Sequence, residues 1–192
     1  MALSHGESAT VAELRTSRRH KGLVIALCVA TYVILAIAVF WPASPWNNSR
    51  LPSSPAVASG VNGYGYGDAA QMTWFLAWVP YALRHGLSFF HTGFLDYPHG
   101  VDLANNTTVP LLALLAAPVT ASLGPIAAFN ILLRLAFASS AASMFLVLRN
   151  WCRWPAAFVG GLAYGFGPYM VTQGQNHLNL VFAPLPPLIV WC

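Results

Sequence analysis

The apolar run of residues 22–41 constrains the fold of this chain more than any other feature. As a helix rising about 1.5 Å per residue, it covers the roughly 30 Å hydrocarbon core of a bilayer. It exceeds the ~7–15 apolar residues of a secretory signal, so we interpret it as an uncleaved first transmembrane helix. Residues 1–21 are predicted to be a cytoplasmic basic tail, because basic residues directly before a span are typical of the cytoplasmic side. These residues are Arg15, Arg18, Arg19 and Lys21.

The composition excludes an ordinary soluble domain. Only 7% of the residues are charged and 57% are hydrophobic, whereas soluble domains carry roughly 25% charged residues. The 9 Lys and Arg residues exceed the 5 Asp and Glu residues, but they do not cluster as a nucleic-acid surface would require. We therefore predict an all-α integral membrane protein that binds no nucleic acid. Its expected location is the cell membrane, as a multi-pass protein with a cytoplasmic N-terminus.

Residues 125–192 are predicted to form a helical membrane region, which gives about four transmembrane helices in total. Arginines at both ends of the link 149–153 place it in the cytoplasm by the positive-inside rule. The stretch 125–148 therefore runs inward, and 155–171 returns outward. The last stretch, 178–192, begins a further span and stops while still apolar. This pattern predicts a truncated chain, or a partner chain that supplies further membrane helices.

Residues 42–124 are predicted to form one large external loop, because the helix that follows them must enter from outside. We interpret segments 69–85 and 108–123 as interfacial helices of this loop. The first carries an aromatic stripe that suits the headgroup level of a membrane. Two crossings by the same segments would also satisfy the topology, and would place Asp96 and Asp102 in the cytoplasm.

Asp68 follows a glycine-rich loop at the start of the first interfacial segment. With Gln71 it forms a variant of the helix capping box, a role in which Asp is worth about 1 kcal/mol. A carboxylate at this place is equally suited to accept a proton from a substrate. Beyond Glu13, the only other acidic residues are Asp96 and Asp102. Residue type and spacing alone do not distinguish cap from catalyst.

A series of short motifs runs along the chain from about Val24 to its end. They are Gly67-Asp68, Trp74, Trp78, Tyr97-Pro98-His99-Gly100, Gly124-Pro125, Phe129-Asn130, Arg149, Gly165-Phe166-Gly167-Pro168-Tyr169 and His177-Leu178-Asn179-Leu180. In order and topology this series resembles the N-terminal part of bacterial multi-spanning GT-C glycosyltransferases. These membrane enzymes are similar in layout to protein mannosyltransferases and to the aminoarabinose transferases of lipid A.

The resemblance implies a polyprenyl-phosphate-linked sugar as donor, used at the external face of the membrane. It also implies an acid in the first external loop as catalytic base or acceptor-orienting group, and that acid falls on Asp68. Inverting transfer from a lipid phosphate needs a carboxylate to take the acceptor proton and a cation to stabilise the departing phosphate. The membrane lipid and the lipid-linked sugar are therefore the expected partners.

Five further residues are candidates for substrate binding. Arg84 is expected at the external interface, and Arg134 lies within a predicted span, where a charge normally faces a partner or a wet cavity. Either can hold the lipid phosphate, although Arg134 can instead snorkel toward outer headgroups. Gln175, His177 and Asn179 belong to a polar patch at the outer end of the third span. This patch can bind sugar hydroxyls, or it is an ordinary turn between helices.

Four side chains of ligand type lie close together in the external loop. Oxygen and imidazole ligands at this density can hold a divalent metal ion, and the resemblance implies such a cofactor in some relatives. The alternative is a solvated turn centred on Pro98 and Gly100, which the spacing favours because no helical or finger-like ligand pattern is present. The four residues are His91, Asp96, His99 and Asp102.

Two other functional classes compete with an enzyme. One is a non-enzymatic lipid-binding or transport subunit that uses the same cavity, and it should tolerate Asp68→Asn. The other is an inactive truncated fragment, whose missing helices would normally complete the cavity.

Overall fold

The computed structural model describes residues 4–52 and 67–192, with side chains described from Arg19 onward in the first range. Over these residues the chain is mostly helical, and its two short strands pair as one antiparallel hairpin. The prediction of an all-α chain is therefore confirmed at the level of secondary structure.

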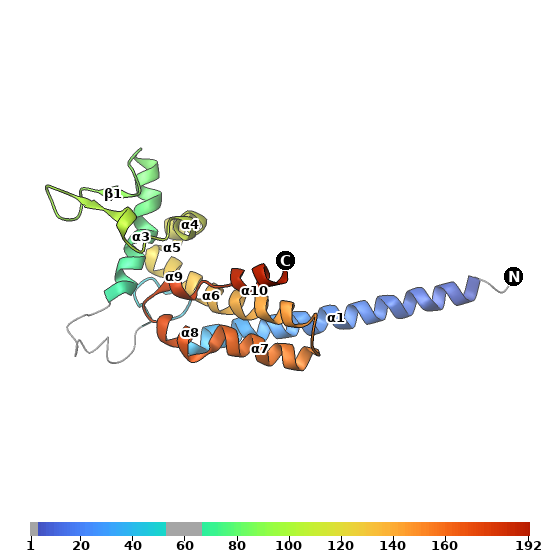
Figure 1. Ribbon diagram of the computed structural model, residues 1–192. Coiled ribbons are helices and arrows are strands. Elements are labelled where there is room, and N and C mark those ends of the chain that lie inside the picture. Colours follow the sequence, from blue (N-terminus) through green and yellow to red (C-terminus); the bar gives the residue numbers. More distant parts are fainter. Residues whose placement is uncertain (1–3, 53–66) are drawn as a thin grey trace.

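Two long helices form the axis of the fold (Figure 1). α1, Ser4–Val39, covers the predicted first span except its last two residues, and α6, Pro125–Leu148, has the bounds predicted for the second. In the described part of the chain, these are the two helices long and apolar enough to cross a membrane by length and composition. α6 is also the central helix, since most of the other helices pack against it.

The third predicted span is divided into two helices. α7, Trp154–Phe166, ends at Gly167, and α8, Pro168–Gln173, follows it. Gly167 has an extended backbone with ψ of 164°, because a residue before proline is kept out of the helical region by the proline ring. The sequence predicted one continuous span here, and the Gly-Pro pair explains the difference.

The fourth predicted span is likewise divided, into α9, Leu178–Val181, and α10, Leu185–Trp191. At the break, the Ala183 N–H donates to Ser140 Oγ at 3.2 Å, and the Tyr164 hydroxyl donates to the Ala183 carbonyl at 2.9 Å. Side chains from α6 and α7 thus replace helical hydrogen bonds that are lost near the prolines. The described residues therefore contain two long apolar helices instead of the expected four or so.

A second group of elements lies at one end of this bundle (Figure 1). α3, Gly67–Arg84, is followed by strands β1, His91–Thr92, and β2, Val101–Asp102, and by the 3-10 helix η1, Leu103–Asn105. In the hairpin, His91 pairs with Asp102, and Thr92 pairs with Val101. α3 confirms that a helix forms where the sequence predicted one over residues 69–85.

The segment predicted as a second interfacial helix forms two short helices that meet at Ala116. These are α4, Pro110–Leu115, and α5, Ala117–Leu123. α4 packs against α3, and α5 packs against α6. A spanning helix needs about 20 residues, so neither helix alone is long enough to cross a bilayer.

Tyr32 joins α1 to the rest of the bundle. Its ring is fully buried, stacks on Phe158 with centroids 5.1 Å apart, and meets Phe145 edge-on. Its hydroxyl donates to the Phe158 carbonyl at 2.9 Å. α7 approaches α6 closely because Gly165 has no side chain, and a Cβ there would lie 2.5 Å from Cβ of Ala141. Small residues at such contacts are typical of packed helices in membranes.

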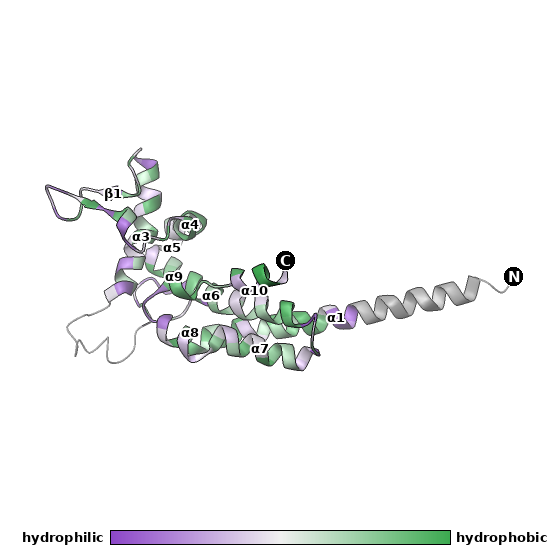
Figure 2. Ribbon diagram, in the orientation of Figure 1, coloured by the Kyte–Doolittle hydropathy of each residue, from purple (hydrophilic) through white to green (hydrophobic). Residues whose placement is uncertain are grey.

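Hydrophilic residues gather at the two ends of the apolar bundle (Figure 2). One end carries the start of α3 and the turn between α8 and α9. The other carries the basic stretch of α1 and the link between α6 and α7. The length of the apolar bundle separates these two polar regions, and the candidate site lies at the end that carries α3.

Candidate functional site

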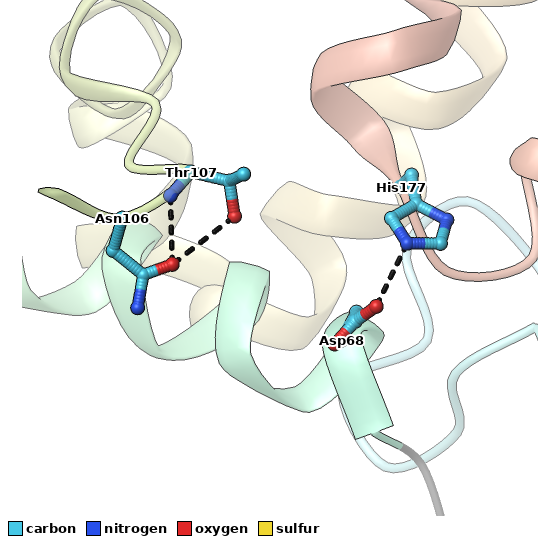
Figure 3. A network of polar contacts seen from close by, with 4 residues as sticks. All are labelled: Asp68, Asn106, Thr107 and His177. Atoms are coloured by element: carbon cyan, nitrogen blue, oxygen red, sulfur yellow. Dashed lines mark hydrogen bonds and ion pairs between the residues drawn. The ribbon is translucent and has the colours of Figure 1, made fainter.

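Asp68 and His177 are in direct side-chain contact at the α3 end of the bundle (Figure 3). His177 Nε2 lies 2.7 Å from Asp68 Oδ2, which is a short hydrogen-bond distance. The His177 and Asp68 side chains are 34% and 54% exposed, so the pair remains accessible. The sequence predicted separate roles for these residues on one face of the membrane, and the structure brings them into direct contact.

Local structure positions both side chains. Asp68 lies in the first turn of α3, where the positive end of the helix dipole favours a carboxylate. His177 precedes α9, and its backbone N–H donates to the Gln173 carbonyl at 2.7 Å. The carboxylate makes no capping hydrogen bond to the residues that the structure describes. The sequence predicted Asp68 as the N-cap of this helix, but α3 already begins at Gly67. Asp68 is therefore a residue of the first turn, and its side chain contacts His177.

The pair leaves hydrogen-bonding capacity unused. When His177 donates through Nε2, its other ring nitrogen, Nδ1, is buried and has no partner in the described part of the chain. Asn179 Oδ1 is also buried without a partner there. Gln175 lies half-buried in the same turn. Buried polar atoms without partners are rare, and they indicate places where water or a ligand completes the hydrogen bonding.

Arg84 lies at the opposite end of α3 from Asp68. It is the last residue of that helix and is exposed. At about 1.5 Å per residue, the two residues are about 24 Å apart along the helix axis. The structure therefore does not bring Arg84 to the Asp68–His177 pair.

Arg134 is buried in α6 and binds backbone carbonyls instead of facing an open site. The side chain is 5% exposed. Its guanidinium donates to the carbonyls of Phe40 and Ala43, just after α1, and to Asn130 one turn earlier in α6. It also lies 5.2 Å from the centre of the Phe40 ring. A cation at the C-terminal end of a helix satisfies carbonyls that have no helical partner, so Arg134 fastens the end of α1 to α6.

The structure does not gather the four predicted metal ligands into a binding group. Among the described residues, no three or more His, Cys, Asp or Glu side chains are placed to hold a metal ion. Asp102 caps η1 instead, because its Oδ1 accepts a hydrogen bond from the Ala104 N–H at 2.9 Å. All four are exposed around the hairpin, as in the alternative of a solvated turn. They are His91, Asp96, His99 and Asp102.

Two features of the structure were not predicted from the sequence. Asn130 donates to the carbonyls of Asn47 and Arg50, both at 2.9 Å, and so helps to hold the chain that follows α1. A cavity of about 290 Å³ lies beside α3 and η1, with Gln71 and Asn106 in its lining. No local pattern links these residues, and the aromatic stripe of α3 is the one sequence signal that pointed to this region.

The geometry thus provides a carboxylate, an imidazole that orients it and a group of uncharged hydrogen-bonding side chains. Such a set can hold a hydroxylated molecule and accept its proton. A cation for a phosphate group is not among the described residues that contact the pair. No family model, no curated protein and no solved structure matches this chain.

Proposed function

We propose that this chain acts in glycosyl transfer of the GT-C type, in which a sugar is transferred from a polyprenyl phosphate at the external face of the membrane. Asp68 is the catalytic base or acceptor-orienting group. The observation that carries the proposal is the 2.7 Å contact between Asp68 and His177, which joins the predicted external loop to the outer turn of the helix bundle. The resemblance of the motifs supplies the reaction class.

In the proposed topology, α1 and α6 cross the membrane and the N-terminus is cytoplasmic. The basic stretch of α1 and the arginines of the α6–α7 link lie toward one end of the bundle, and the start of α3 lies at the other (Figure 2). Positive residues are retained on the cytoplasmic side. The Asp68–His177 pair then faces the external side, where a lipid-linked sugar would be presented.

In the proposed reaction, the acceptor oxygen forms a bond to the anomeric carbon of the donor sugar. The bond from that carbon to the phosphate oxygen breaks, and the polyprenyl phosphate leaves with the electron pair. The acceptor proton moves to the carboxylate of Asp68, whose other oxygen is held by His177. His177 thereby fixes the direction of the free carboxylate oxygen, which is what an acceptor hydroxyl must meet.

The direct test compares Asp68→Asn with Asp96→Asn in membranes that contain the full chain. Asn keeps the size of Asp and removes its ability to take a proton. Radiolabelled polyprenyl phosphoryl hexoses serve as donors, and transfer of label to a product is measured. We expect a loss of about 100-fold or more in Asp68→Asn, the usual contribution of a general base. Asp96→Asn is the matched control, because Asp96 is exposed in the hairpin loop.

Full transfer in the Asp68→Asn protein would exclude Asp68 as the base. Binding of lipid-linked sugar without transfer in the unmodified protein would instead support the lipid-binding or transport subunit. The two classes thus give different results in the same assay.

A further inference from the structure

A cavity beside α3 has the lining of a site for an uncharged sugar ring. It has a volume of about 290 Å³ and lies where the first two turns of α3 face β2, η1 and the residue after η1. Gln71 and Trp74 contribute from α3, Leu103 from η1, and Asn106 from the chain that follows. The volume is near the lower end of the range for small-molecule sites, which suits a single ring.

Asn106 is oriented by its neighbour. Its side-chain oxygen Oδ1 accepts from the Thr107 N–H at 2.7 Å and from the Thr107 hydroxyl at 3.3 Å (Figure 3). These bonds fix the amide plane, and the Nδ2 group keeps both of its donors free of partners in the described part of the chain. The side chain is thus a preset hydrogen-bond donor at the edge of the cavity.

Gln71 and Trp74 add further hydrogen-bonding groups. Neither the Gln71 amide nor the Trp74 indole N–H has a partner among the described residues, and both side chains line the cavity. An amide offers both donors and an acceptor, so Gln71 can bind a hydroxyl in either sense. An acyl chain in this cavity would leave these groups without partners, which is costly.

The remaining lining is apolar and partly aromatic. The Trp74 indole stacks on Trp78, with centroids 5.4 Å apart and planes within 6°. Trp78 therefore covers one face of Trp74, whose side chain also belongs to the lining of this cavity. Phe75 and Leu103 are each 1% exposed and contribute apolar atoms to the lining. A surface of this kind packs against the C–H groups of a ring.

The lining contains no ionisable side chain. An anion such as a phosphate would lose its hydration without gaining a cation, which is unfavourable. The ligand should therefore be uncharged, with hydroxyls at its edge and an apolar face. We infer that this cavity binds the pyranose ring of a neutral sugar, held by Gln71 and Asn106 beside Trp74.

The site lies close to the proposed base. Gln71 follows Asp68 by three residues and so is about one turn, or about 4.5 Å, farther along the helix axis. Residues at this spacing are neighbours on one side of a helix. The inference rests on the proposed function for the fate of the sugar, but sugar binding itself is measured without any transfer.

The experiment is saturation-transfer NMR on the full chain in lipid nanodiscs, without sugar-based detergents. The probes are the methyl β-glycosides of glucose, mannose and galactose, with cyclohexanol and glycerol 3-phosphate as apolar and anionic controls. We expect saturation of the ring protons of at least one glycoside, and of neither control compound. Gln71→Met and Asn106→Ser should each weaken binding about tenfold, as expected for loss of one or two hydrogen bonds.

Asn105→Ser is the matched control, because Asn105 is the adjacent exposed asparagine and does not line the cavity. It should leave glycoside binding unchanged. Equal binding of cyclohexanol, or binding of the glycosides that survives in both the Gln71 and Asn106 variants, would overturn the inference. So would the absence of saturation for all three glycosides. If the Gln71 variant fails to fold, the exposed Asn106 position decides the result.

Two further arms separate this site from the proposed reaction and identify the source of the sugar. Transfer and glycoside binding are separate measurements, so transfer by Asp68→Asn tests the proposed reaction, and binding by Gln71→Met and Asn106→Ser tests the cavity. Competition with a short isoprenyl phosphoryl hexose, but not with the isoprenyl phosphate alone, would assign the cavity to the donor sugar. Simultaneous binding of the isoprenyl phosphoryl hexose and the glycoside would assign it to the acceptor.

Discussion

His177 Nε2 donates to Asp68 Oδ2 across 2.7 Å and thereby links the turn before α9 to the first turn of α3. The pair is too exposed to be a major source of stability, since exposed ion pairs contribute about 0–1 kcal/mol. We expect the pair to orient the carboxylate of Asp68 instead. Loss of the pair should therefore lower sugar transfer but leave the free energy of unfolding nearly unchanged, and both quantities can be measured.

Replacing His177 with Ala should lower sugar transfer by about tenfold, because the carboxylate of Asp68 loses the group that orients it. The free energy of unfolding should change by less than about 1 kcal/mol. Transfer rates of the two single variants and of the double variant Asp68→Asn with His177→Ala give the coupling. The double variant should transfer sugar at the same rate as Asp68→Asn alone, because the effects of substituting two residues that act as one unit do not add. Independent, multiplying losses would show that His177 acts elsewhere.

Arg134→Met should destabilise the folded chain by about 2–4 kcal/mol. The change removes a buried guanidinium and leaves the carbonyls of Phe40 and Ala43 without their donor, and each buried orphan costs about 1–3 kcal/mol. Thermal unfolding in detergent is the measurement. Arg84→Met is the matched control, because Arg84 is exposed, and its effect should stay within about 0.5 kcal/mol. Equal effects of the two variants would contradict the assigned role of Arg134.

Gly165→Ala should separate α7 from α6 and cost about 1–3 kcal/mol, the usual range for overpacking. The new Cβ would lie 2.5 Å from Cβ and 2.7 Å from the backbone nitrogen of Ala141, so the helix itself has to move. Gly93→Ala serves as the control, since a Cβ there has no atom within 4 Å. Unfolding of both variants is followed by circular dichroism. An unchanged transition for Gly165→Ala would rule out this helix contact.

The proposed topology predicts which cysteines a membrane-impermeant maleimide reaches in intact cells. Cys152 is exposed in the link after α6 and should react only after the membrane is permeabilised. Ala104→Cys, at an exposed residue of η1 and in a background without native cysteines, should react in intact cells. The opposite pattern at residue 104 would support two crossings by the segments 69–85 and 108–123. The short lengths of α4 and α5 argue against those crossings.

Local pattern predicted much of the helical architecture. The bounds of α6 agree with the apolar stretch 125–148, and α3 falls where the aromatic stripe predicted a helix. The sequence did not predict that the third and fourth spans are divided at Gly167 and near Pro184. Hydropathy is averaged over a window of residues and does not detect a change of backbone conformation at one position. The four predicted metal ligands are not gathered in the described structure, for a related reason. Closeness in sequence does not make exposed side chains converge on one point.

The sequence by itself determined that this chain forms apolar helices with polar residues at their ends, because these properties depend on runs of neighbouring residues. It also identified Asp68 and His177 as separate candidates. Only the tertiary structure decided that they touch, that Arg134 holds the end of α1, and that Gln71 and Asn106 line one cavity. Each of these contacts joins residues from different elements, and their distance is set by how the helices pack and not by any local pattern.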